Sequence, residues 1–159
     1  MRKILLAVVF IIYPIHAAIA LSSLSREPIW AARHIEGLPP ELRTRVLALE
    51  NACGDSIAAR HYFSTSIDIG NSSFAALHFE NLRCRNAQVI CSSKGCLHEV
   101  YIKTGQAYRR ILKLYARDIR MTEADGKLEI RVGYDDGLTA LRWTGRNFVR
   151  TQAGLPGAF

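Results

Sequence analysis

Lys127-Leu-Glu-Ile-Arg-Val132 is the stretch that decides the fold class, because charged and aliphatic residues alternate through it without a break. Successive side chains of a β-strand point to opposite faces of the sheet. We therefore expect a strand with Leu128, Ile130 and Val132 facing a core, and with Lys127, Glu129 and Arg131 facing solvent. A sheet of this kind must cover its apolar face with another element.

Segments with the same two-residue period lie on both sides of this strand. Glycine-containing turns separate several of them, such as Asp135-Asp136-Gly137. We expect strands at His61–Ile69, Phe74–Phe79, Cys96–Lys103, Tyr108–Leu114, Leu138–Trp143 and Asn147–Thr151.

Two of these segments need a further remark. In Cys96–Lys103 the alternation places Cys96, His98, Val100 and Ile102 on one face, and Leu97, Glu99 and Tyr101 on the other. Residues 108–119 also satisfy helical spacing, through Tyr108, Ile111, Leu112, Tyr115 and Ile119. Alternating neighbours favour a strand there, and the helix stays open as an alternative.

One amphipathic helix is predicted between Pro40 and Cys53. Proline suits the first helical position, and Gly54 suits a left-handed cap at the end. Leu42, Val46 and Leu49 form a narrow apolar stripe on this helix. The predicted fold class is α+β, with this N-terminal helix packed on a mainly antiparallel, disulfide-stapled β-sheet. We expect the helix stripe to share one core with Leu128, Ile130 and Val132.

The first twenty residues have the layout of a secretory signal peptide. Arg2 and Lys3 precede an apolar block that ends in Ala18-Ile19-Ala20, with small residues at the cleavage positions. The predicted organisation is a signal peptide over 1–20, a flexible lead-in over 21–37, a single domain over 38–151 and a mobile tail over 152–159. The mature protein is then periplasmic or secreted and has no membrane span. A retained N-terminal anchor is the alternative.

The charge of the mature chain is moderately positive. Cleavage leaves nineteen basic and fourteen acidic side chains, a net charge of +5. No basic block is long enough for a nucleic-acid-binding arm, so we expect no nucleic-acid partner. An envelope protein or an anionic polymer is the expected partner. A candidate basic patch, weighed against an ordinary solvated face, consists of Arg109, Arg110, Lys113, Arg117 and Arg120 with Tyr108 and Tyr115 among them.

The chain contains four cysteines: Cys53, Cys84, Cys91 and Cys96. An even number in an oxidising compartment favours two disulfides. Gly95 permits a tight reversal between Cys91 and Cys96, which makes that pair the first choice and leaves Cys53–Cys84. The pairing Cys84–Cys91 with Cys53–Cys96 remains open.

Candidate chemistry centres on two histidines and two carboxylates. His78 lies two residues before Glu80, and His98 lies directly before Glu99. These four residues are the acid–base candidates for a hydrolase. A zinc site made of Cys84, Cys91, Cys96 and His98, and a nucleophilic pair of Cys96 and His98, are both disfavoured by disulfide formation. We therefore expect no catalytic residues, no metal and no cofactor.

Several short motifs resemble a family of small exported bacterial proteins of unknown function. They are Ala52-Cys53-Gly54, Tyr62-Phe63, Asp68-Ile-Gly-Asn71, Leu82-Arg-Cys84, Tyr108-Arg109 and, most specifically, the segment from Cys91 to Tyr101. Where members of that family carry an oxygen-rich turn, this chain keeps only Asp68 and Asn71, too few for calcium. The resemblance implies export and a similar fold, and it implies no activity.

These observations predict a small exported domain that acts by binding. The predicted function is a non-catalytic binding or inhibitor-like module of the cell envelope. The alternative is a small envelope hydrolase that uses His78 and His98 with Glu80 and Glu99. The direction of the two imidazoles separates the hypotheses: buried, packed rings favour binding, and convergence in a cleft with a carboxylate favours an enzyme.

Overall fold

The computed structural model describes residues 28–54 and 56–151, which fold around a five-stranded antiparallel sheet. The signal peptide predicted over 1–20 and the tail over 152–159 lie outside the described residues. The strands run in the order β2-β3-β6-β5, and β7 pairs with β6. Their bounds are Ser64–Ile69 for β2, Ser72–His78 for β3, Cys91–Ser92 for β5, Gly95–Thr104 for β6 and Ala107–Ala116 for β7.

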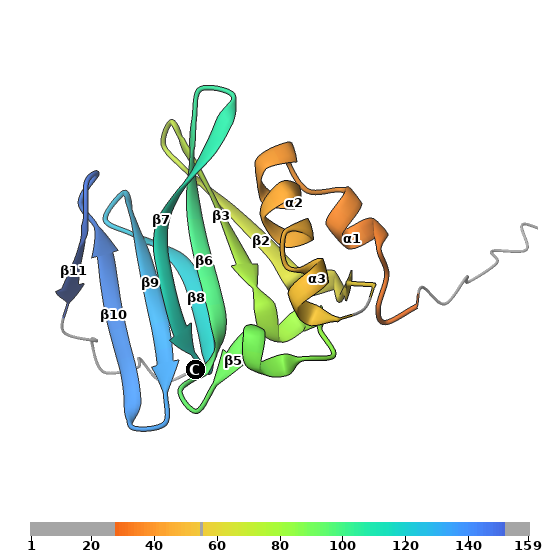
Figure 1. Cartoon of the computed structure of the whole chain (residues 1–159). Helices are drawn as coiled ribbons and strands as arrows, with labels where there is room; N and C mark the ends of the chain where they lie inside the picture. The colour runs from red at the N-terminus through yellow and green to blue at the C-terminus, as the bar shows by residue number, and fades with distance from the viewer. Residues whose placement is uncertain (1–27, 55, 152–159) are drawn as a thin grey trace, which may run out of the picture.

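A second, four-stranded antiparallel sheet packs against the first (Figure 1). It consists of β11 (Phe148–Thr151), β10 (Gly137–Trp143), β9 (Lys127–Tyr134) and β8 (Asp118–Ala124), in that order. The chain passes from one sheet to the other between β7 and β8, where the Arg117 amide donates to the Gly133 carbonyl at 2.9 Å. A small third sheet pairs β1 (Ala58–Ala59) with β4 (Leu82–Arg83).

Short helices cover the outer face of the five-stranded sheet (Figure 1). They are α1 (Arg33–Glu36), α2 (Pro40–Leu47) and α3 (Glu50–Cys53), and single 3-10 turns lie at η1 (His61–Phe63), η2 (Phe79–Asn81) and η3 (Ala87–Val89). None of the helices in the described part of the chain has both the length and the apolar character needed to cross a bilayer.

The five-stranded sheet is apolar on both faces, which produces two separate cores. On one face, Leu42 and Val46 of α2 pack with Leu77 of β3 and neighbouring residues. On the opposite face, Phe74 of β3 packs with Ile130 of β9 and the rest of the inter-sheet core. The molecule therefore has three layers: helices, the five-stranded sheet and the four-stranded sheet.

The predicted α+β class is wrong, because strands dominate and the helices are short. Strands account for 54% of the described residues and helices for 20%. The predicted helix over residues 40–53 forms two pieces, α2 and α3. At the break, the Leu49 amide donates a hydrogen bond at 3.0 Å to the Val46 carbonyl, three residues back instead of four. Pro40 does open the first piece, and Gly54 caps the second with φ +74°.

The prediction of one shared core is also wrong. Leu128, Ile130 and Val132 face inward as expected, but the β-sheet lies between them and the stripe of Leu42 and Val46. A period-two pattern does not reveal whether the second face of a neighbouring strand is also buried. The predicted lead-in is partly ordered as well, because α1 lies within it and buries Ile35.

Most predicted strands are present, with boundaries shifted by a few residues. The ambiguous segment 108–119 forms β7 and the start of β8, so the strand prediction is confirmed and the helical alternative is excluded. The segment His61–Ile69 begins instead with the turn η1. Strand β8 has no counterpart among the predicted strands. The three short strands β1, β4 and β5 were likewise not predicted.

Candidate functional site

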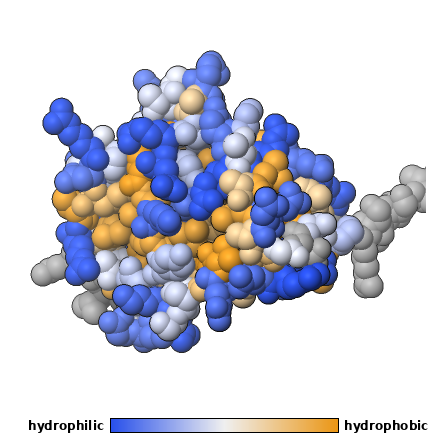
Figure 2. Space-filling view, in the orientation of Figure 1, coloured by the Kyte–Doolittle hydropathy of each residue, from blue (hydrophilic) through white to orange (hydrophobic). Residues whose placement is uncertain are grey.

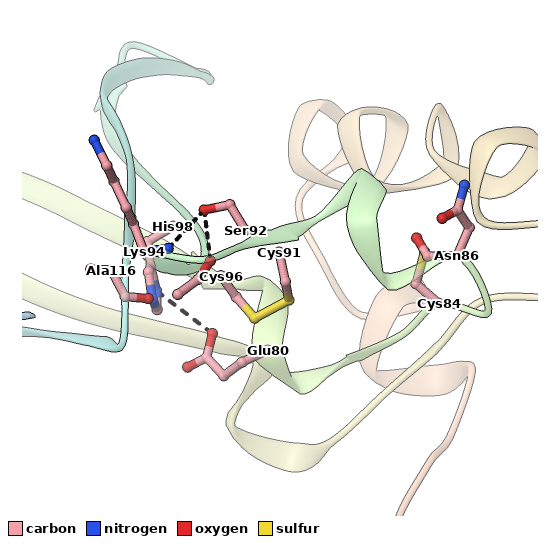
Figure 3. The surroundings of a disulfide bond; sticks show 10 residues. Glu80, Cys84, Asn86, Cys91, Ser92, Lys94, Cys96, His98 and Ala116 are labelled. Atoms are coloured by element: carbon pink, nitrogen blue, oxygen red, sulfur yellow. Dashed lines mark hydrogen bonds and ion pairs between the residues drawn. A yellow bond between two sulfur atoms is a disulfide. The ribbon is translucent and has the colours of Figure 1, made fainter. Parts of the chain in front are cut away.

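Both first-choice disulfides form, and the described residues contain no free cysteine. Cys53 at the end of α3 is bonded to Cys84, and Cys91 is bonded to Cys96 across the β5–β6 hairpin (Figure 3). These bonds exclude the alternative pairing. They also remove the thiolates required by the cysteine-containing zinc set and by the Cys96–His98 nucleophile.

His78 and His98 are brought together by the register of the sheet. They are directly opposed on the antiparallel strands β3 and β6, and their ring centroids lie 5.4 Å apart with the planes nearly perpendicular. His98 is fully buried and His78 is 7% exposed. Both side chains lie on the face that packs against the four-stranded sheet.

Glu80 approaches both imidazoles from the turn η2. One carboxylate oxygen lies 3.8 Å from Nδ1 of His78, and the other lies 3.7 Å from Nδ1 of His98. The Glu80 side chain is 31% exposed, so the cluster has one edge near solvent. Figure 3 shows Glu80 pointing toward His98 across the start of β6.

The second ring nitrogen of each histidine contacts another protein group. Nε2 of His98 lies 3.3 Å from the Ala116 carbonyl oxygen, and Nε2 of His78 lies 2.9 Å from the Thr65 hydroxyl. The His78 ring also borders a cavity of about 300 Å³ between β2 and β8. Each imidazole is therefore held at Nε2 and directs Nδ1 toward Glu80.

Burial favours the neutral form of all three groups. It raises the pKa of the Glu80 carboxyl to about 7. Burial, followed by the charge of neighbouring His98, lowers the pKa of His78 to about 4. Burial also lowers the pKa of His98. The imidazoles consequently present unprotonated nitrogen at neutral pH.

Glu99 does not belong to this cluster, although it follows His98 directly. Successive strand residues face opposite ways, so the Glu99 carboxylate lies on the helix side of the sheet. Arg45 and Tyr101 donate hydrogen bonds to it, and Arg110 forms an ion pair at 2.8 Å. Burial opposes ionisation, but these hydrogen bonds and the charges of Arg45 and Arg110 outweigh it and hold the pKa of Glu99 below its usual range.

The candidate basic patch is divided among different environments. Arg110 is bound to Glu99, and Arg117 forms an ion pair with Asp135. Arg109 and Lys113 are exposed on β7, while Arg120 lies on β8. The solvated-face interpretation fits these positions better than a single anion-binding patch.

A groove opens where β7 diverges from the β9–β10 hairpin. It has a volume of about 660 Å³ and a floor of partly buried side chains that includes Leu114 and Tyr134. Figure 2 shows hydrophobic surface gathered on this side of the molecule, between β7 and β10. The groove is lined by Ser93, Lys94, Leu114, Tyr115, Tyr134, Asp135, Asp136, Thr139 and Arg150.

The rim of the groove carries charge of both signs, but the acidic side is partly neutralised. Asp135 is paired with Arg117. Neither Lys94 nor Arg150 has an acidic partner among the described residues. Sequence reasoning missed this groove, because its lining comes from four separate segments and contains no motif. It also missed Thr65, whose role depends entirely on its position opposite His78.

No protein family, curated protein or solved structure matches this chain. The resemblance to small exported bacterial proteins stays a prediction.

Proposed function

We propose that this protein is an exported, non-catalytic binding domain whose groove accepts an extended, acidic peptide segment of a protein partner. The proposal includes a periplasmic or secreted location, which the two disulfides support because such bonds persist in oxidising compartments. The observation that carries the binding function is the groove beside the free edge of β7.

The edge of β7 offers a means of recognising an extended peptide. Within the described part of the chain, this ten-residue strand pairs only with β6, so its outer backbone groups have no strand partner. A peptide that adds to such an edge gains main-chain hydrogen bonds and places alternate side chains into neighbouring pockets. Here the neighbouring pocket is the groove with Leu114 and Tyr134 in its floor.

Charge on this side of the molecule favours an acidic segment. Lys94 and Arg150 both lie at the rim of the groove. A carboxylate on the peptide supplies the acidic partner that Lys94 and Arg150 otherwise lack. Opposite charges across an interface steer association and select among partners.

The hydrolase alternative has weaker geometric support. Its four candidate residues fall on two faces of the sheet, and Glu99 is already bound by two arginines and a tyrosine. His98 has no exposed surface from which to reach a substrate. The two imidazoles do converge on the Glu80 carboxylate, but both rings are buried and packed, which favours binding over catalysis.

A photo-crosslinking experiment in the exporting cell tests the binding function. Benzoylphenylalanine replaces Thr139 in the groove, or Arg131 on the outward face of β9 as a matched control. We expect a discrete adduct from position 139 that a protease digests. The adduct should be absent from position 131, and it should disappear from position 139 when Leu114→Arg is added. Adducts of equal yield from both positions, no adduct at all, or a protease-resistant polymer adduct would overturn the proposed peptide partner.

A further inference from the structure

We propose that His78, Glu80 and His98 form a binding site for one divalent transition-metal ion of the zinc type. Its ligands are Nδ1 of each imidazole and a carboxylate oxygen of Glu80. The inference goes beyond the proposed peptide-binding function and does not depend on it, because none of these residues lines the groove.

The first step is the tautomer of His98. A backbone carbonyl only accepts hydrogen bonds, so the contact between Nε2 and the Ala116 oxygen places the ring hydrogen on Nε2. The neutral ring then carries a lone pair on Nδ1, the atom that faces Glu80 (Figure 3). Metal-bound histidines commonly donate their other N–H to a carbonyl in this way.

The second step is the unfavourable contact that this tautomer creates. Nδ1 of His98 and Oε2 of Glu80 are both buried, and neither has a hydrogen-bond partner. Their separation of 3.7 Å is too long for an O–H···N hydrogen bond. Two buried polar atoms that face each other without a hydrogen bond gain nothing from the contact, and a cation bound by both atoms supplies the missing attraction.

The third step is the match to the geometry of an ion. Two ligand atoms bound to a tetrahedral zinc ion lie about 3.4 Å apart. Nδ1 of His98 lies 3.7 Å from one Glu80 oxygen and Nδ1 of His78 lies 3.8 Å from the other, each a few tenths of an ångström longer than this. The three ligand atoms all lie within 4.8 Å of one another, so the two imidazoles as well as Glu80 draw closer when an ion closes the site.

The ligand types select the class of metal. Two imidazole nitrogens and one carboxylate suit zinc and its neighbours, whereas magnesium and calcium prefer oxygen ligands alone. Three protein ligands leave a fourth position for water. The partly exposed Glu80 side chain gives an ion access from solvent, and the negative charge of nearby Asp118 favours a cation.

The experiment uses the disulfide-bonded protein, freed of metal by dialysis against a chelator and titrated with zinc sulfate. We expect one zinc ion per chain by calorimetry and a higher melting temperature with zinc, because a ligand that binds only the folded state stabilises it. Glu80→Gln should weaken zinc binding at least 100-fold. Loss of a residue that only supports a metal ligand typically weakens the affinity roughly 10- to 100-fold, so a larger effect identifies Glu80 as a ligand. Glu41→Gln, on the exposed face of α2, should leave binding unchanged.

Two further measurements separate a lost ligand from a lost fold. In the metal-free state, Glu80→Gln keeps the size of the side chain and removes a carboxyl whose charged form burial disfavours, so this variant should melt at or above the wild-type temperature. Thr65→Val removes only the group that holds His78, and should weaken zinc binding about 10- to 100-fold. Cobalt(II) should give the visible spectrum of a four-coordinate site in the wild type and not in Glu80→Gln. Failure of the wild type to bind one zinc ion, or equal zinc binding by Glu80→Gln and Glu41→Gln, would overturn the site.

Discussion

Arg45 and Glu99, fifty-four residues apart in the chain, form a two-pronged ion pair beneath helix α2. The Arg45 Nε lies 3.0 Å from one carboxylate oxygen, and its Nη2 lies 3.0 Å from the other. The Glu99 side chain is fully buried, while that of Arg45 is 25% exposed. The guanidinium also lies over the Phe79 ring, 5.6 Å from its centroid. This pair links the helical layer to the central strand.

Arg45→Met should destabilise the protein by about 3 kcal/mol. Breaking a buried ion pair by removing one partner leaves an uncompensated charge, which typically costs about 3–5 kcal/mol. The lower end applies because Arg110 and Tyr101 still bind the carboxylate. Arg43→Met on the same helix should cost under about 0.5 kcal/mol, as surface changes usually do. Denaturant melts give both values, and equal midpoints for the two variants would contradict the prediction.

The two cores should respond independently to truncation. Ile130→Ala in the inter-sheet core and Val46→Ala in the helix-side core should each be destabilising, the first by about 2–5 kcal/mol. Because a β-sheet separates the two residues, the double variant should equal the sum of the singles within about 0.5 kcal/mol. Urea titrations of the three variants measure this. A coupling energy above 1 kcal/mol would point to a shared core.

Arg131→Ala serves as the control for Ile130→Ala, since the two residues are adjacent on β9 and face opposite ways. The Arg131 side chain is largely exposed and pairs only weakly with Glu129, at 3.5 Å. It should cost under about 0.5 kcal/mol. A cost for Arg131→Ala as large as that for Ile130→Ala would mean that the register of β9 is wrong.

Gly95→Ala should be far more damaging than Gly105→Ala. Gly95 has φ +109°, and an added Cβ would overlap the Ala116 carbonyl, so β6 or β7 would have to move. Backbone strain and overpacking together should cost about 3 kcal/mol or more. Gly105 has φ +62° with open space around it, so its substitution should cost about 1 kcal/mol. Thermal melts of the two variants decide the order, and a reversed order would contradict the close approach of the two strands.

The two disulfides should contribute unequally to stability. Cys53–Cys84 spans 31 residues and Cys91–Cys96 spans 5. In the chain-entropy account, loops of these lengths are worth about 4 and about 2 kcal/mol. Paired Cys→Ala variants of each bond, compared by guanidinium denaturation, should show this difference. Thiol labelling of the denatured, non-reduced wild type should find no free cysteine; labelling at Cys96 would contradict the pairing.

The local sequence pattern was enough to locate most of the strands, but it did not predict how the strands are arranged into two sheets and three layers. Alternation through Lys127–Val132 correctly assigned the inward face of β9, but it wrongly placed Glu129 in solvent: this residue is only 8% exposed and pairs with Arg131 and Arg142. The stripe of Leu42 and Val46 correctly indicated a helix. Nothing in either pattern states that Leu97 and Tyr101, on the second face of β6, are also buried. The three-layer arrangement therefore required the structure.

The candidate sites show the same limit. The spacing of His78 and Glu80 made both visible as candidates, and the even number of cysteines indicated disulfides. Which residue of β6 lies opposite His78 depends on strand register, which sequence pattern leaves open. Glu99 looked equivalent to Glu80 in the sequence. One peptide unit separates Glu99 from His98, and that step carries it to the other side of the sheet.

The consecutive residues His98 and Glu99 also help to fix the register of β6 against β3. If β6 slipped by a single residue against β3, every side chain would change faces. The carboxylate of Glu99 would then enter the apolar space between the two sheets, and the imidazole of His98 would take its place near Arg45. The displaced Glu99 would be especially costly, since a buried unpaired charge is among the most destabilising defects a protein can carry. The central strand thus accepts only one alignment.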